Sequence, residues 1–534
     1  MRCGPRTVHG LTWTLGALVL ACGPPGSEPS PAPSGRLPPA DLCAGLVQGP
    51  AAHPMSPLAP PAKGAAVVDP EFGTRIRRLT SAPRSEGENA VVKPMYSTVQ
   101  AWNADESFLV LWHRGQGHEL YDGHTYRLIR NLRLVSPTDL EQVLWDPLDP
   151  DVLYYPSNYN AVPNLMRYNV STDKSVVARH FEFCPTGDWG RLLSLGSDPM
   201  YLSWGERPRL VGLSCGDTKF LYDIARDEVL GRTSVSTRVT AQPGASGQVA
   251  WFFDSYVYDT AFRRLRTVPL GDPSSHSSLG LSGTTGHDVL SSVVFDPPAG
   301  GSEAADVGTL VSFDLQTGTR KVVIGFASGY PYPPSGTHVS AVAHRRPGWV
   351  AVSAVGDPAG RGILEQELLL ANVDTGTVCR VGHHRSFARE GAWGYWAEPH
   401  VVISPSGTRL LFGSDWGNGT TVDTYVVELP AYSGSHAGIS ENRWILGSSL
   451  PRVAASKRGG DRPRERRHLR LRHAEAHQTS PFLIGSQGTD YQNLEGFYDE
   501  PARSFVLTGK VPGVGRIPRP KLRQAYGSRA PAGM

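Results

Sequence analysis

Phe313-Asp-Leu-Gln-Thr-Gly318 and Ala371-Asn-Val-Asp-Thr-Gly376 are two copies of one pattern, in which a β-prone run ends at Asp or Asn and Gly follows four residues later. The Asp or Asn side chain caps such a turn through its own backbone, and Gly accepts the positive φ that the turn requires. Because another β-prone run follows each turn, the pattern predicts antiparallel hairpins.

Turns of this kind recur along the chain. Their acidic or amide positions are Asp122, Asn169, Asp223, Asp259, Asp314, Asn372 and Glu428, and the successive spacings are 47, 54, 36, 55, 58 and 56 residues. Repeats of about 50 residues predict a β-propeller, whose blades are four-stranded antiparallel sheets. The expected fold is therefore all-β, a seven-bladed β-propeller over residues 65–432.

A further hairpin, Val68-Asp-Pro-Glu-Phe-Gly73, precedes the first full repeat. We expect this segment to pair with the last blade and close the ring, which would remove free sheet edges. An eight-bladed ring is the alternative. A second recurring turn, seen in Asn103–Ser107, Asp146–Pro150 and Ser404–Thr408, is expected between the first two strands of a blade.

The composition of the 534 residues allows a large folded core, since 40% are hydrophobic. The 52 basic and 49 acidic residues leave a net charge of +3, which does not favour nucleic acid as a partner. The sequence contains no phosphate-binding loop and no His-Glu-x-x-His motif.

The N-terminus, residues 1–22, has the features of an export signal. Arg2 and Arg6 precede a short apolar run, Leu11–Ala21, that is too short to span a bilayer. The run ends at Val19-Leu-Ala-Cys22, which resembles a bacterial lipobox and implies lipidation of Cys22. An ordinary secretory signal is the alternative. We expect a monomer that its lipid holds at the cell envelope, on the outer membrane or the periplasmic face.

Export changes what is expected of the cysteines, because disulfides persist in oxidising compartments. Cys43, Cys184, Cys215 and Cys379 remain after the signal and the lipidated Cys22. Cys184 and Cys215 lie within one repeat and are the best candidates for a disulfide, with two buried thiols as the alternative.

Two segments flank the expected propeller. Residues 23–64 are rich in Pro, Ala, Gly and Ser, which predicts an unfolded spacer. Residues 433–534 form a basic, irregular tail, with nine basic residues between Arg452 and Arg472. A basic arm for anionic surfaces, a poorly folded tail and a frameshifted segment are the three interpretations of this tail.

Three histidines occupy equivalent places in successive repeats, since His276, His338 and His400 are separated by 62 and 62 residues. Equal spacing in a rotational repeat places equivalent residues around one axis, so these imidazoles could converge and bind a divalent metal with Glu398 as an oxygen ligand. The metal is left open between Mn, Ca and Zn. The alternative is a set of unrelated polar residues on a solvated channel wall.

Other residues are candidates for ligand binding near the same mouth. His383 and His384 could exchange protons there, Tyr395 and Trp396 could form an aromatic shelf for sugar rings, and Arg345 could neutralise a carboxylate. The alternatives are exposure for the His pair, burial between blades for the aromatic residues and a solvated turn for Arg345.

The segment Pro399-His400-Val-Val-Ile-Ser-Pro-Ser-Gly-Thr-Arg-Leu-Leu-Phe-Gly-Ser-Asp415 resembles a blade of the oligogalacturonate lyases, seven-bladed propellers related to the periplasmic TolB type. In that family a His-Pro-His segment precedes the same Ser-Pro-x-Gly turn and, with a His from the preceding blade and a Gln, holds a divalent metal. The resemblance implies that His400 matches the second His, that Glu398 replaces the first, and that His338 matches the third. The Gln position falls near Tyr395.

Two functions follow as hypotheses. The first is an envelope lipoprotein whose propeller binds a ligand or a protein partner at its channel mouth, with or without a divalent metal. The second, implied by the resemblance, is a metal-dependent lyase that acts on acidic oligosaccharides by β-elimination. That reaction needs a base and a group that neutralises the carboxylate, and the sequence assigns no residue as the base.

Overall fold

The computed structural model describes residue 37 and residues 40–187, 193–194, 200–235, 240–251, 256–267, 276–294, 309–330, 338–387, 394–417 and 419–432. It also describes the backbone of three short strands between residues 481 and 508. The expected signal peptide, the lipidation site Cys22 and the basic run 452–472 lie outside the described residues.

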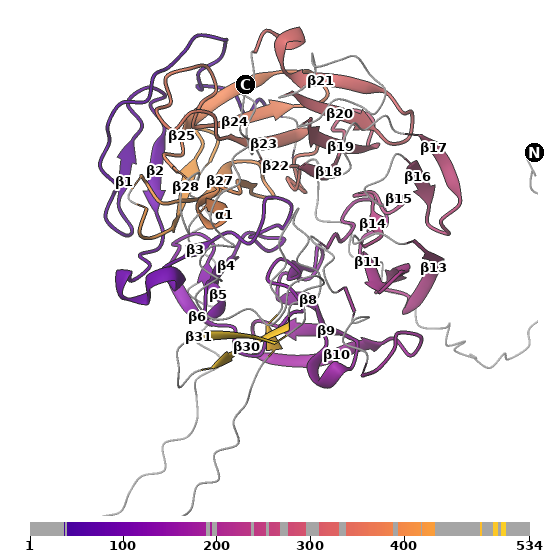
Figure 1. The fold of residues 1–534 in the computed structure, drawn as a ribbon. Helices are drawn as coiled ribbons and strands as arrows, with labels where there is room; N and C mark the ends of the chain where they lie inside the picture. Colours follow the sequence, from indigo (N-terminus) through magenta and orange to yellow (C-terminus); the bar gives the residue numbers. More distant parts are fainter. Residues whose placement is uncertain are drawn as a thin grey trace, which may run out of the picture. The chain divides into compact units, whose positions relative to one another are not determined.

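Seven antiparallel sheets follow one another around a propeller ring (Figure 1). Blade 1 consists of β3 (Val92–Lys93), β4 (Phe108–His113), β5 (Gly117–Asp122) and β6 (Leu128–Asn131). Blade 2 consists of β7 (Leu144–Trp145), β8 (Val152–Ser157), β9 (Asn164–Asn169) and β10 (Lys174–His180). Blade 3 comprises β11 (Leu210–Cys215), β12 (Thr218–Asp223) and β13 (Glu228–Ser234). A bridge between Leu202 and Val211 marks its innermost segment.

The next three blades each have four strands. Blade 4 consists of β14 (Gln242–Pro243), β15 (Val249–Trp251), β16 (Tyr256–Asp259) and β17 (Arg264–Thr267). Blade 5 consists of β18 (Ser277–Leu281), β19 (Asp288–Val293), β20 (Leu310–Asp314) and β21 (Arg320–Ile324). Blade 6 consists of β22 (His338–Ser340), β23 (Trp349–Ala354), β24 (Glu367–Asn372) and β25 (Val378–His383). The predicted seven-bladed propeller is therefore confirmed, and the eight-bladed alternative is not.

The predicted turns account for the strand ends. Asp314 Oδ1 accepts hydrogen bonds from the backbone N–H groups of Gln316 and Thr317, and Gly318 takes a φ of 79°. Asn372 and Gly376 form the same turn in blade 6. In each case the polar side chain satisfies backbone donors that the hairpin leaves free.

Blade 7 closes the ring with strands from both ends of the propeller. Its sheet contains β26 (Val402–Ile403), β27 (Arg409–Ser414) and β28 (Asp423–Glu428), followed by the N-terminal β2 (Arg75–Arg78) and β1 (Ala66–Val68). β2 pairs with β28 along four residues, as the extra hairpin predicted. A buried ion pair between Arg409 and Glu106 ties blade 7 to blade 1, with 2.5 Å between Nη2 and Oε2.

The N-terminal segment before β1 corrects the expectation of an unfolded spacer over its described part, residues 40–64. Leu42 and Cys43 are buried in the core, and Cys43 forms a disulfide with Cys379 of β25. Val47 pairs with Arg380, whose Nη1 also donates to the Gly49 carbonyl over 3.3 Å. A composition rich in Pro and Ala concealed these few anchoring residues.

Cys184 and Cys215, the pair named from the sequence, are joined by a disulfide with 5.6 Å between their Cα atoms. The tail contains a small antiparallel sheet of β29 (Pro481–Phe482), β30 (Glu495–Asp499) and β31 (Ser504–Thr508), where the sequence predicted no regular structure. No helix in the described part of the chain is long and apolar enough to cross a lipid bilayer.

Candidate metal centre at the channel mouth

The first strands of neighbouring blades lie side by side around the ring axis. Ser278 Oγ of β18 accepts a hydrogen bond from the Ala341 N–H, and Ser340 Oγ of β22 accepts one from the Ile403 N–H of β26. Residues at the start of these strands therefore meet at one mouth of the channel.

The three histidines with equal spacing lie at this mouth. His276 precedes β18, His338 begins β22 and His400 comes two residues before β26. The ring centroids of His276 and His338 are 4.1 Å apart, and those of His338 and His400 are 4.2 Å apart. The structure thus brings together residues that are 62 and 62 positions apart in the sequence.

Glu398 completes a group with metal-binding potential. Its Oε2 lies 3.3 Å from His400 Nε2 and 3.7 Å from His338 Nε2, and one ligand atom from each of the three residues lies within 4.8 Å of the others. His338 and His400 are fully buried, whereas the Glu398 side chain is 26% exposed. The group therefore opens to solvent on the carboxylate side.

His338 has the fewest polar partners of the three residues in this group. Its side chain is 0% exposed, and neither ring nitrogen has a hydrogen-bond partner in the described part of the chain. A buried polar atom without a partner costs about 1–3 kcal/mol. Burial, reinforced by the nearby charges of His276, His400 and Lys93, lowers the pKa of His338 well below its usual value. The imidazole is therefore neutral, which is the form that binds metals.

Blade 1 supplies two residues of the site that the spacing did not reveal. The Tyr96 ring lies 5.2 Å from the His338 ring and 4.9 Å from the His400 ring, and it packs edge-on against both. Lys93 of β3 is buried and donates from Nζ to the Glu398 carbonyl over 2.9 Å. A lysine within the apolar run Ala90–Lys93 was the only signal in the sequence.

Lys93 and Glu398 alter each other's environment. Burial lowers the pKa of Lys93 to about 7, although the charges of Glu398 and Glu141 act in the opposite direction. Burial raises the pKa of Glu398 to about 7, against the charge of Lys93. Gly413 leaves the space that Lys93 occupies, since a Cβ at this glycine would lie 3.2 Å from the Lys93 Cβ.

The aromatic pair lies beside this group. Tyr395 and Trp396 belong to the single-turn helix α1 (Gly394–Ala397). The Tyr395 ring is 5.0 Å from the His400 ring and 36% of the residue is exposed. Trp396 stacks on Trp112 of blade 1 with 4.9 Å between ring centroids, so it is partly covered by a blade.

Three other predicted residues lie away from the mouth. His383 is fully buried and faces Asp69 and Glu71, and the His384 Nε2 pairs with the Ala354 carbonyl over 3.0 Å. The sequence placed both at the mouth because the chain continues from them to Glu398, but their side chains point into the packing of blades 6 and 7.

Arg345 lies at the turn of the β22–β23 hairpin, whereas His338 lies at its open end beside Ser353. The two residues are therefore at opposite ends of one hairpin. Arg345 cannot neutralise a ligand held by His338 in this arrangement.

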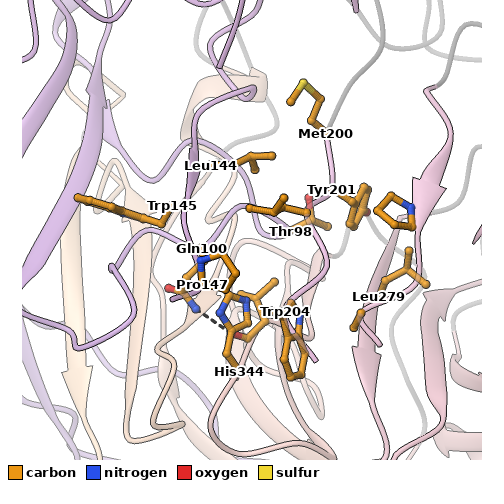
Figure 2. A pocket seen from close by; sticks show the side chains of 14 residues that line it. Thr98, Gln100, Leu144, Trp145, Pro147, Met200, Tyr201, Trp204, Leu279 and His344 are labelled. Atoms are coloured by element: carbon orange, nitrogen blue, oxygen red, sulfur yellow. Dashed lines mark hydrogen bonds between the residues drawn. The ribbon is translucent and has the colours of Figure 1, made fainter. Parts of the chain in front are cut away.

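Figure 2 shows a small cavity whose lining includes Trp204 and His344. The two rings stack with 4.7 Å between their centroids. Gln100 Nε2 donates to the carbonyls of Val342 and Ile403 there. The cavity measures only about 40 Å³, and none of the histidines at the mouth lines it. A volume of this size holds only a few water molecules.

No protein-family model matches the chain, and no curated protein matches it significantly. Solved structures with a similar arrangement include an oligogalacturonate lyase in complex with manganese, with 15% identity and a TM-score of 0.47 over 69% of this chain and 96% of that one. An oligogalacturonate lyase from Vibrio parahaemolyticus has 12% identity and a TM-score of 0.48, over 69% and 99%.

A chain in a structure of the mitotic checkpoint complex covers 69% of this chain and 97% of its own length, with 10% identity and a TM-score of 0.38. Similarity this weak, spread over proteins of such different kinds, gives no residue of this chain a role. The candidate metal site is therefore inferred only from the positions of residues in this chain.

Proposed function

We propose that the protein is a ligand-binding propeller whose channel mouth holds a divalent metal ion through His338, His400 and Glu398. The observation that carries this proposal is the buried His338 imidazole, which faces two further ligand atoms and has no hydrogen-bond partner among the described residues. His276 lies close enough to support the group or to join it.

The donor set favours a first-row divalent ion. Imidazole nitrogen suits Zn, Cu, Fe and Ni and carboxylate oxygen suits Mn, whereas Ca²⁺ prefers an all-oxygen set of six to eight ligands. Two imidazoles and one carboxylate leave further coordination positions for a ligand. The exposed side of Glu398 and the exposed ring of Tyr395 mark the direction from which that ligand would arrive.

Metal content in the purified full-length chain tests this proposal. Elemental mass spectrometry should find about one ion per chain more in the wild type than in a His338→Ala/His400→Ala variant. A His180→Ala/His287→Ala variant removes two histidines outside the mouth and should keep the ion. Equal metal content in the two double variants would refute the proposal.

A lyase acting on acidic oligosaccharides is the second candidate. It is favoured by Lys93, a buried amine beside Glu398 whose pKa lies near 7, since β-elimination requires a group that can accept a proton. The test is incubation with an oligouronide, followed by ultraviolet absorbance of the unsaturated product. Activity in the wild type that Lys93→Met abolishes would support the enzyme; a folded, metal-loaded protein without activity would leave the binding function.

We also propose that the protein is exported and anchored by lipid on Cys22, and that its partner is an acidic oligosaccharide or an envelope protein. The apolar run Leu11–Ala21 and the two disulfides of the described residues support export. Labelling with a radioactive fatty acid, compared between wild type and Cys22→Ser, tests the anchor. An unlabelled wild-type protein would contradict it.

A further inference from the structure

A second polar cluster lies outside the channel, where the turn of the β1–β2 hairpin meets the end of β25. Asp69 and Glu71 come from the turn, and His383 is the last residue of β25. Thr74 Oγ1 donates to the Val381 carbonyl over 2.6 Å, and Asp69 Oδ2 accepts the backbone N–H of His383 over 3.0 Å. These bonds join the closing hairpin of blade 7 to the outer strand of blade 6.

The side chain of His383 is aimed into this cluster without a hydrogen bond. It is 0% exposed, and Nδ1 lies 3.4 Å from Asp69 Oδ2 and 3.6 Å from Glu71 Oε2. Neither of its ring nitrogens has a hydrogen-bond partner among the residues that the structure describes, and the same holds for the buried Glu71 Oε2. One ligand atom from each of the three residues lies within 4.8 Å of the others.

The cluster is buried and is not a surface patch. The Phe72 ring covers His383 at a centroid distance of 4.9 Å, and Asp69 is fully buried. The Glu71 side chain, 11% exposed, is the point nearest to solvent. Its other oxygen, Oε1, accepts the N–H of Ser56, so the carboxylate is held in place by the N-terminal segment.

Among the residues that the structure describes, Arg385 is the arginine or lysine that forms ion pairs with both carboxylates. Its Nη2 lies in ion-pair contact, 3.5 Å from Asp69 Oδ2 and 3.7 Å from Glu71 Oε2, and makes no well-aligned hydrogen bond among the described residues. Arg385 is held instead by the Ser56 carbonyl, to which Nη1 donates over 2.6 Å, and it lies 5.8 Å from the Trp416 ring centre. The guanidinium therefore offsets one of two carboxylate charges without saturating the oxygens.

We propose that Asp69, Glu71 and His383 form a second, structural metal site that takes a first-row divalent cation and fastens the closing hairpin of blade 7 to blade 6. Two carboxylates and one imidazole suit Zn²⁺ or Mn²⁺. The ion would satisfy the buried Glu71 and His383 atoms together. Arg385 acts as a competing cation, which weakens binding at this site.

Metal stoichiometry of the full-length protein tests the proposal with Zn²⁺ and Mn²⁺ as separate probes. The variants are His383→Gln and the milder Glu71→Gln, which keeps an oxygen for Ser56, together with the His338→Ala/His400→Ala variant. We expect two ions per chain in the wild type, one in each single variant and one in the double variant. Arg385→Gln should retain both ions and bind the second about tenfold more tightly, because a neighbouring positive charge is removed.

The outcomes separate this site from the channel mouth. One ion lost only on His338→Ala/His400→Ala overturns the second site and leaves the proposed function intact. One ion lost only on Glu71→Gln supports the second site and overturns the proposed function. Wild-type protein without metal overturns both. A lower melting temperature after chelation, absent in Glu71→Gln, would show that the ion stabilises the hairpin.

Discussion

The hydroxyl of Tyr395 donates a hydrogen bond to Glu141 Oε1 over 2.7 Å, although the two residues are 254 positions apart. Tyr395 belongs to the helix before blade 7, and Glu141 lies in the connection before blade 2. Blade 1, which contributes Lys93 and Tyr96 to the candidate metal centre, lies between them in the ring. The bond thus links the two blades that flank these residues.

Tyr395→Phe should remove this bond while the ring stays against His400. Glu141 is almost fully buried, so the loss of one partner should lower the free energy of unfolding by about 1–3 kcal/mol. Urea denaturation measures the change. Tyr159→Phe is the matched control, because its side chain is exposed and should show no effect. Equal stability of both variants would mean that the bond does not hold the mouth together.

Lys93→Met should tighten metal binding at the mouth. The positive charge of Lys93 repels a cation bound by Glu398, and methionine fills a similar volume without that charge. We expect about a tenfold lower dissociation constant in isothermal titration calorimetry with Zn²⁺. Weaker binding would instead show that the bond from Lys93 to the Glu398 carbonyl positions the ligand group.

Glu106→Gln should strongly destabilise the fold. The change leaves Arg409, a fully buried guanidinium, without its carboxylate, and breaking a buried pair in this way costs about 3–5 kcal/mol. Asp149→Asn breaks the exposed pair with Arg167 and should cost less than about 1 kcal/mol. Chemical denaturation of both variants gives the comparison, and similar values would contradict the role of Arg409 in ring closure.

Acid should destabilise the protein through buried neutral histidines. Burial lowers the pKa of His118 to about 4 and those of His344 and His384 to about 3. The unfolded chain takes up protons at these positions below pH 6.5 while the folded chain does not, so stability falls as the pH falls. At pH 5 each group should contribute about 2 kcal/mol of destabilisation relative to pH 8.

His113 acts in the opposite direction and reduces the net effect. Burial would lower its pKa, but hydrogen bonds and charges from Glu119 and Glu86 outweigh burial and raise it. Its contribution is complete at low pH and is lost as the pH rises through the folded-state pKa. Melting temperatures between pH 5 and 8 should therefore fall toward acid, and His384→Gln should make that slope shallower. An unchanged slope would contradict the assignment.

The disulfide between Cys43 and Cys379 should stabilise the fold by holding the N-terminal segment. Cys43→Ser/Cys379→Ser should lower the free energy of unfolding by about 2–4 kcal/mol, because the unfolded chain regains the freedom of a very long loop. Limited proteolysis should cut the double variant first near residues 43–58. Protease resistance equal to that of the wild type would show that Arg380 and the backbone contacts suffice.

Local signals predicted most of the fold. The turn at Asp314 and Gly318 depends on residues four positions apart, so each hairpin could be identified without knowledge of its neighbours. Ring closure was predictable because Val68–Gly73 repeats the hairpin pattern. The pairing of Cys43 with Cys379 was not, since no repeat relates the two positions.

The candidate site was predictable only where the repeat itself contributes. His276, His338 and His400 share one position in three blades, and their convergence follows from rotational symmetry. Lys93 and Tyr96 come from blade 1, at positions without histidine counterparts. His383 was misplaced because sequence proximity to Glu398 does not reveal which way a side chain at the end of a strand points.

The pairing of β2 with β28 also constrains biosynthesis. The ribosome makes β2 before any full blade, yet the partner of β2 is the last strand of the propeller. The backbone hydrogen-bonding groups on the outer edge of β2 therefore lack their native partner until blade 7 has been synthesised. A chaperone that covers this edge would protect the nascent chain from joining a second copy in the meantime.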